Sequence, residues 1–232
     1  MKTNICEIYP CLQGEGSRAG TPSILIRTSG CNLRCRWCDT PYTSWQPEEG
    51  IYNTEDVLFA LNANTHIEDV IITGGEPTLC RSLGEIIELC VEKGKRITLE
   101  TNATQLIAEN LMRAVDLVSL SPKLSNSSPA EKAAALRHDT DRIRISVIRK
   151  WIESAADYHL KFVVSDPGDI REINELIEES GIERRNIYLM PEGRTEKELQ
   201  QKRLWLADLC IREGFRYCER LHIIIYGDKR GV

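Results

Sequence analysis

The feature that most constrains the fold of this chain is the alternation of apolar, strand-like runs with amphipathic, helix-like segments. Strands are expected at residues 23–28, 69–73, 96–100, 117–121, 159–164, 186–190 and 221–226. Helices are expected at residues 54–64, 82–93, 105–115, 141–154, 169–180 and 195–213, with an Ala-rich helix after residue 129. Strands that alternate with helices form βαβ units with parallel strands. We therefore predict an α/β fold, a single-domain partial (β/α) barrel of about six parallel strands, with a doubly wound sheet as the alternative.

The positions of the polar and glycine-rich motifs favour the barrel. Reactive groups in a barrel gather at the C-terminal ends of its strands. A cysteine-rich loop, at about residues 29–50, follows the first expected strand, and Gly74-Gly75 follows the second. Glu100, Ser121 and Met190 end three later strands. Three helix starts carry capping-box spacing: Ser82 with Glu85, Asp169 with Glu172, and Thr195 with Glu198.

Length and composition exclude several classes of protein. The 232 residues suit one domain, 1–232, and the net charge of −5 argues against direct binding of nucleic acid. We find no apolar stretch long enough for a signal peptide or a membrane span. Nine cysteines in such a chain indicate reduced thiols and a metal site. We therefore expect a cytoplasmic protein that contacts no membrane.

Three cysteines, Cys31, Cys35 and Cys38, form a C-x3-C-x2-C motif in a polar loop. Clusters of the [4Fe–4S] type are usually held by four thiolates, so three local ligands leave one iron open. An open coordination position is typical of a catalytic metal site. The alternative is a zinc site with Cys11, Cys80 or His66 as the fourth ligand.

With Trp37 as the aromatic residue, the motif resembles the signature of radical S-adenosylmethionine (SAM) enzymes. In that family SAM chelates the fourth iron through its amino and carboxylate groups. Gly74-Gly75-Glu76-Pro77 resembles the family's GGEP element, which binds the SAM amino group. The resemblance implies that Ser121 and Lys123 bind the SAM carboxylate. It gives as cofactor-binding residues Trp37, Cys38, Asp39, Gly74, Gly75, Glu76, Ser121, Pro122, Lys123, Met190 and Pro191.

From about residue 9 to the tail, the chain further resembles the 7-carboxy-7-deazaguanine synthase family, through Leu12–Gly16, Arg27, Cys38-Asp39-Thr40 and Leu221-His222. The resemblance implies a lyase that contracts the ring of 6-carboxy-5,6,7,8-tetrahydropterin to 7-carboxy-7-deazaguanine and releases ammonia, in queuosine and 7-deazapurine biosynthesis. It implies Mg²⁺ bound at Thr40, and a substrate site of Leu12, Gln13, Gly14, Glu15, Arg27, Thr73 and His222. Arg27 could instead form a structural ion pair, and His222 could be a core residue.

Two other functions remain open at this point. A glycyl-radical enzyme activase has a similar size and cluster motif, and it would act on a protein backbone without magnesium. A non-catalytic zinc or iron–sulfur module is the second alternative. For the synthase we expect a small-molecule pterin substrate, an electron donor such as flavodoxin or ferredoxin, and a homodimer.

Overall fold

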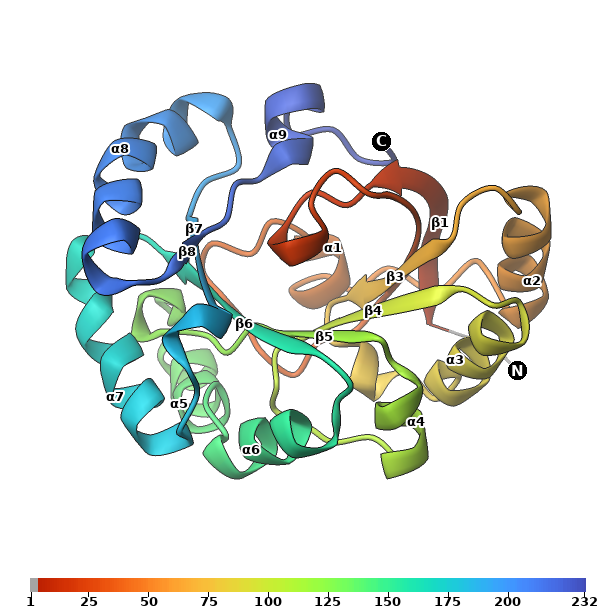
Figure 1. Cartoon of the computed structure of the whole chain (residues 1–232), viewed down its shortest axis with the longest axis horizontal. Coiled ribbons are helices and arrows are strands. Elements are labelled where there is room, and N and C mark those ends of the chain that lie inside the picture. Colours follow the sequence, from red (N-terminus) through yellow and green to blue (C-terminus); the bar gives the residue numbers. More distant parts are fainter. Residues whose placement is uncertain (1–3) are drawn as a thin grey trace.

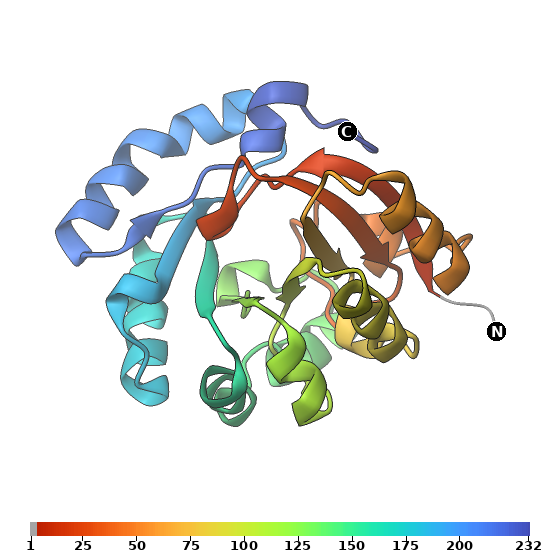
Figure 2. The same ribbon diagram turned by 45° about the vertical axis from the view of Figure 1, so that its right-hand side comes forward.

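A computed structural model describes residues 4–232 and shows one curved, eight-stranded sheet with helices on its outer side (Figures 1 and 2). The strands lie in the order β1 to β8, as they occur in the sequence. From β2 onward every neighbouring pair is parallel, whereas β1 pairs with β2 antiparallel. A doubly wound sheet would reverse its strand order at a switch point. The predicted partial (β/α) barrel is therefore confirmed.

The sheet has one more parallel strand than the predicted six, and an antiparallel strand at its edge. Its strands are β1 (Ile5–Leu12), β2 (Pro22–Thr28), β3 (Asp69–Gly74), β4 (Arg96–Thr101), β5 (Leu117–Leu120), β6 (Tyr158–Val164), β7 (Ile187–Pro191) and the short β8 (Arg216–Tyr217). The middle strands are buried nearly throughout, because helices cover one face and the barrel interior the other.

Helices follow most of the strands (Figure 2). Those that pack against the outer face of the sheet are α2 (Thr54–Ala63), α3 (Leu83–Glu92), α4 (Glu109–Ala114), α6 (Ile145–Ser154), α7 (Ile170–Ser180) and α8 (Glu196–Glu213). Their apolar faces and the strands form one core that contains Trp151, Phe162 and Cys90, all fully buried. The helix α5 (Lys132–Asp141) contacts the cysteine loop through His138. Two short helices, α1 (Pro41–Ser44) and α9 (Leu221–Tyr226), instead contribute residues to the lining of the cavity described below. No helix within residues 4–232 is both long and apolar enough to cross a membrane.

Two local predictions are wrong. Residues 221–226 form α9 and not a strand, and only Ile223 of its three isoleucines is buried. No strand was predicted before residue 23, but Ile5–Leu12 form the edge strand β1, so the cysteine loop follows the second strand and not the first. Pro10 has no N–H to donate, which an edge strand tolerates.

Candidate active site

The C-terminal ends of β2 to β7 surround a cavity of about 340 Å³, which lies where the barrel argument places the reactive groups. The cavity is lined by the three motif cysteines and by most of the other predicted site residues: Leu12, Gln13, Gly14, Glu15, Arg27, Trp37, Asp39, Thr40, Thr73, Gly74, Gly75, Ser121, Lys123, Met190 and His222. Glu76, Pro122 and Pro191 do not line it. One cavity therefore joins the predicted cofactor and substrate residues.

The cysteine loop is held from outside by two residues that the sequence did not single out. The backbone N–H of Arg34 donates to His138 Nδ1 at 3.1 Å, and the N–H of Arg36 donates to the Ser127 carbonyl at 2.9 Å. Ser127 Oγ lies 2.9 Å from His138 Nε2. Both His138 and Ser127 are buried. The two loop amides on either side of Cys35 are thereby fixed.

The three thiols fit an iron–sulfur cluster in chemistry and position. All three line the same cavity, and soft thiolate ligands select iron–sulfur clusters or zinc. Burial raises the pKa of Cys31 to about 11 and that of Cys35 to about 12, so metal binding must displace their protons. Among residues 4–232, no three His, Cys, Asp or Glu side chains are arranged to hold a single metal ion.

Of the three residues named as a fourth zinc ligand, Cys80 and His66 do not line the cavity of the motif cysteines. Cys80 packs in the hydrophobic core, and His66 is exposed at the surface. Cys11 lines the cavity, and burial raises the pKa of its thiol to about 11.

Gly74 and Gly75 form a turn that only glycine fits. A Cβ on Gly75 would lie 2.3 Å from the Gly30 carbonyl oxygen, and Gly74 has a φ of +150°. The turn thus packs its backbone against the start of the cysteine loop, where Gly75 N–H donates to the Thr28 carbonyl at 3.0 Å. Glu76 follows but points into the protein. Its carboxylate accepts from Thr78, from Thr101 Oγ1 at 2.7 Å and from Asn102 N–H at 2.7 Å, so it supports the turn from behind.

Ser121 and Lys123 form a cationic site on the cavity wall. Lys123 Nζ donates to the Ser121 carbonyl at 2.6 Å and to Ser121 Oγ at 2.8 Å. Neither acceptor is charged, so the ammonium keeps its full charge for an anionic ligand. Trp37 lies on the same side of the cavity, packed against Met190, and its Nε1 donates to Asn126 at 3.1 Å. The residues predicted to bind the SAM carboxylate thus lie just after β5, in the cavity that the motif cysteines also line.

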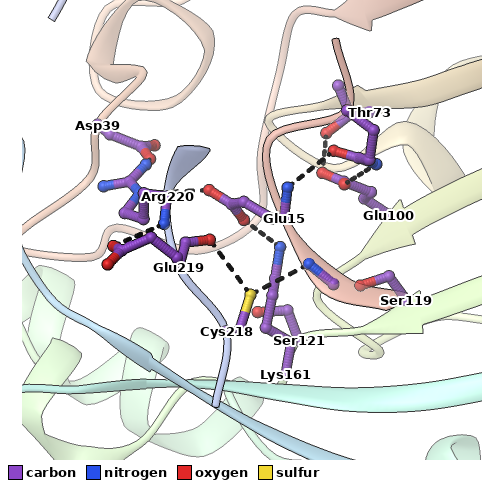
Figure 3. Close-up of polar contacts among 12 residues, drawn as sticks. Glu15, Asp39, Thr73, Glu100, Ser119, Ser121, Lys161, Cys218, Glu219 and Arg220 are labelled. Atoms are coloured by element: carbon purple, nitrogen blue, oxygen red, sulfur yellow. Dashed lines mark hydrogen bonds and ion pairs between the residues drawn. The ribbon is translucent and has the colours of Figure 1, made fainter. Parts of the chain in front are cut away.

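The opposite side of the cavity carries a carboxylate without an ion pair. Gln13 Nε2 and Thr73 Oγ1 each donate to Glu100, both at 3.1 Å (Figure 3). No Lys, Arg or His within the described part of the chain forms an ion pair with Glu100. Two of the predicted substrate residues, Gln13 and Thr73, are thereby positioned by one acid at the end of β4.

A chain of charges, buried except at Asp39, connects the N-terminal turn around Glu15 with the cysteine loop (Figure 3). Lys161 pairs with Glu15, whose other oxygen accepts from Arg220 Nε at 3.2 Å, and Arg220 also pairs with Asp39. Burial opposes ionisation of Glu15, but the charges of Lys161 and Arg220 hold its pKa below its ordinary value. Arg220 donates to the Gly193 carbonyl at 2.5 Å as well. Four segments distant in sequence therefore meet at Arg220.

Arg27 has the anionic partner that its position in a buried strand requires. Its Nε lies 2.5 Å from Glu7 Oε2, because the antiparallel register of β1 and β2 places Glu7 opposite Arg27. Glu7 also pairs with Arg230 and accepts from Tyr42 at 3.3 Å. The structural ion pair considered for Arg27 is thus present. The guanidinium still lines the cavity, so contact with a substrate carboxylate stays a prediction.

Thr40 and His222 both line the cavity, although they are distant in sequence. Thr40 Oγ1 accepts from Thr43 Oγ1 at 3.1 Å and lies 3.9 Å from Cys38 Sγ. A hydroxyl oxygen next to the cluster loop suits a hard cation such as Mg²⁺, whose remaining ligands are water and substrate. His222 lies on α9 and not on a strand, against Gly14, where a Cβ would be 2.1 Å from its Nδ1. Burial lowers the pKa of His222 and favours the neutral ring.

The sequence did not assign roles to Lys161, Glu100, Arg220 and Arg230, which complete the cavity. Lys161 lies inside the apolar run 158–164, and this position could have predicted a buried ion pair, because a buried lysine needs an acidic partner. Arg230 gave no such signal. It donates to Glu48 at 2.7 and 2.9 Å, and its guanidinium lies 3.9 Å from the ring centre of Tyr42. Both contacts depend on the tertiary fold.

Known proteins resemble this chain over nearly its whole length. The Radical SAM superfamily model matches residues 25–206. The chain is 39% identical over 231 residues to the 7-carboxy-7-deazaguanine synthase of Rhodopirellula baltica, which covers 98% of this chain and 88% of that protein. This chain belongs to the 7-carboxy-7-deazaguanine synthase family. The family's protein from Halobacterium salinarum is 38% identical over 237 residues, covering 97% of this chain and 90% of that one.

Membership of the 7-carboxy-7-deazaguanine synthase family confirms the resemblance found in the sequence. The cofactors predicted there, a [4Fe–4S] cluster, SAM and Mg²⁺, are those of this family. The crystal structure of QueE from Escherichia coli has a TM-score of 0.67 to this chain at 24% identity, covering 95% of this chain and 94% of that one. That likeness concerns the fold. It extends over nearly the whole sheet and its helices.

Proposed function

We propose that this chain converts 6-carboxy-5,6,7,8-tetrahydropterin to 7-carboxy-7-deazaguanine with release of ammonia. The observation that carries the proposal is the single cavity, in which the three thiols, the Gly75 turn and Lys123 lie beside Arg27, Thr40 and Glu15. A radical formed at SAM would then arise next to a site for an anionic heterocycle. The family membership supports the synthase over the glycyl-radical activase, which needs a surface groove for a polypeptide.

When bound, the cluster and SAM would supply the radical chemistry that activates the substrate at C6. We assign Cys31, Cys35 and Cys38 to the cluster, and Gly75 and the Ser121–Lys123 pair to the amino and carboxylate groups of SAM. The protein's own contribution is to position and enclose the reactants.

The pterin is assigned to the side of the cavity that contains the Leu12–Gly14 backbone, Thr73 and Arg27. Arg27 and a Mg²⁺ ion at Thr40 would together neutralise the substrate carboxylate and fix C6. Glu15 is already ionised and paired with two cations, so it can accept hydrogen bonds from the pterin but is not set to take a proton. The neutral His222 ring lies beside Gly14.

The direct test is an assay of anaerobically reconstituted protein with the carboxylated tetrahydropterin, SAM and a reductant. We expect 7-carboxy-7-deazaguanine and ammonia in equal amounts, with SAM not consumed. Net formation of 5′-deoxyadenosine and methionine without the deazapurine would contradict the proposal.

Thr40→Ala is expected to lose most of the stimulation by Mg²⁺ and about 100-fold in turnover, because a misplacement of C6 by about 1 Å has that effect. Cluster content and SAM binding should be unchanged. The measurement is turnover against Mg²⁺ concentration after chelator treatment. Thr43→Val is a matched control, since the Thr43 hydroxyl donates to Thr40 but does not line the cavity. Equal activity of the unaltered enzyme with and without Mg²⁺ would refute the assignment.

The remaining partners follow from this reaction. The chain would work as one domain in the cytoplasm, where its thiols stay reduced, and as a homodimer with a small-molecule substrate. The reduced cluster requires an electron from a donor such as flavodoxin or ferredoxin.

A further inference from the structure

The hydroxyl group of Ser44 lies beside one of the three motif thiols. Ser44 is the last residue of α1, and its Oγ lies 3.1 Å from Cys38 Sγ. The Ser44 side chain is only 2% exposed, and both residues line the cavity. Within residues 4–232, Cys38 Sγ is the one hydrogen-bond partner of this hydroxyl. A buried polar group of this kind therefore has a sulfur atom as its partner.

Binding of iron decides which of the two atoms donates the hydrogen. A cysteine binds a metal as its thiolate, which has no proton to donate. In the loaded site the Ser44 O–H is therefore the donor and the Cys38 sulfur is the acceptor. Hydrogen bonds to a charged acceptor are roughly twice as strong as those between neutral groups. The contact is thus expected to strengthen when the cluster is present.

The segment that carries Ser44 is attached to the cysteine loop on both sides of this residue. Before it, the Thr43 carbonyl accepts from Gly30 N–H at 2.8 Å. After it, Trp45 Nε1 donates to the Cys35 carbonyl at 2.9 Å. Ser44 is therefore held against the loop by its own neighbours in sequence. Its position does not depend on a bound substrate.

The other motif sulfur atoms have longer contacts. Cys31 Sγ accepts from Leu33 N–H at 3.4 Å, and it lies 3.9 Å from Asn102 Nδ2. Among the hydrogen bonds to motif sulfurs in the described part of the chain, that of Ser44 is the shortest. It is also donated by a side chain, so a single substitution can remove it.

We propose that Ser44 sets the reduction potential of the cluster by donating a hydrogen bond to the Cys38 thiolate. The inference rests on the proposed function, because that reaction needs a reduced cluster. Reduction adds one electron, which comes from the one-electron donor of that reaction, and no bond forms or breaks. The added electron makes the sulfur ligands more negative, so the hydrogen bond stabilises the reduced form more than the oxidised form. Ser44 therefore acts through Cys38.

The test is a redox titration of anaerobically reconstituted Ser44→Ala and unaltered protein, without SAM or substrate. The electron paramagnetic resonance signal of the reduced cluster gives the reduced fraction at each potential. Without the hydroxyl, we expect the ratio of reduced to oxidised cluster at a given potential to fall about tenfold, which is about 59 mV for one electron. Ser44→Thr keeps a hydroxyl and should have a potential closer to that of the unaltered protein. The potential is measured on the clusters present, so incomplete loading does not affect it.

Ser29→Ala is the matched control. Ser29 lies at the start of the cysteine loop and is buried as well, but its hydroxyl has no hydrogen-bond partner within residues 4–232. The ratio of reduced to oxidised cluster in this variant should stay within twofold of that in the unaltered protein. A fall below threefold in Ser44→Ala, or one that Ser29→Ala shares, would overturn the role of Ser44. So would a Ser44→Thr potential no higher than that of Ser44→Ala.

The titration requires no turnover, so it separates this inference from the proposed function. Unaltered protein that holds the cluster but forms no 7-carboxy-7-deazaguanine would refute the proposed function. The potentials of the variants would still show whether Ser44 donates to the cluster. A potential that does not respond to Ser44→Ala, in protein that does form the product, would refute the role of Ser44 alone.

Discussion

Replacing Cys35 by alanine is expected to abolish reductive cleavage of SAM. Cys35 is the middle thiol of the motif, it lines the cavity, and the loop amides on both sides of it are fixed by His138 and Ser127. Two thiolates cannot hold a cluster that normally needs three protein ligands and SAM. The measurements are iron and sulfide content after reconstitution and the yield of 5′-deoxyadenosine.

Cys90→Ala is the matched control for Cys35→Ala. Cys90 is fully buried in α3 and packs in the hydrophobic core. Its loss should cost about 1 kcal/mol of unfolding free energy, typical of a small core deletion, with iron content unchanged. Undiminished SAM cleavage by Cys35→Ala would disprove the cluster assignment, because no other cysteine of the loop could replace it.

The second large effect is expected for Lys161→Met, which removes one cation from a buried chain of charges. Breaking a buried ion pair costs about 3–5 kcal/mol when the remaining charge stays uncompensated, and here Arg220 still compensates Glu15 in part. We therefore expect a loss of about 3 kcal/mol in unfolding free energy at pH 7. The N-terminal turn should also shift, lowering kcat/KM by about 100-fold. Denaturant unfolding and the turnover assay measure the two effects.

The effect of Lys161→Met should depend on pH in a defined direction. The folded-state pKa of Glu15 is lower than its ordinary value of 4.5, so its ionised form contributes stability above that pH. The contribution disappears as the pH falls and the carboxylate takes up a proton. The difference between the two proteins should then be largest near pH 7 and shrink below about pH 4.5. Lys202→Met, which breaks a more exposed pair with Glu192, should cost less than about 1 kcal/mol.

The local signals that predicted elements correctly are those that depend on nearby residues alone. Thr195 and Glu198 form the predicted capping box, and α8 begins directly after Thr195. Ser82 shows the limit of such signals: it makes no capping hydrogen bond, since Glu85 accepts from Thr54 of α2 instead. A partner from another helix cannot be read from spacing.

The largest errors have a tertiary cause. The run 221–226 has the composition of a strand, but the sheet ends at the two-residue β8. These residues instead form α9, next to the cavity. At the start of this helix, Leu221 N–H donates to the Gly14 carbonyl at 2.9 Å. Likewise Glu7, the partner of Arg27, could be identified only once β1 was known to lie antiparallel to β2.

Lys161, Arg220 and Glu100 show why part of the site remained hidden in the sequence. Their partners are distant in sequence and lie in the turn that follows β1: Glu15 for Lys161 and Arg220, and Gln13 for Glu100. The cysteine and glycine motifs were recognisable because their ligands are local. Charged residues that are distant in sequence and meet only in the folded protein leave no recognisable spacing in the sequence.

The meeting of the two ends of the chain at the cavity has a kinetic consequence. Glu15 pairs with Arg220, 205 positions later, and Glu7 pairs with Arg230, 223 positions later. Both views show the C-terminal segment beside β1 (Figures 1 and 2). Closing so long a loop has an entropic cost. The intervening sheet lowers this cost when it forms, because it brings the two ends of the chain together. On the ribosome, the barrel can therefore begin to form early, but the side of the cavity that contains Glu15 and Arg27 is assembled last.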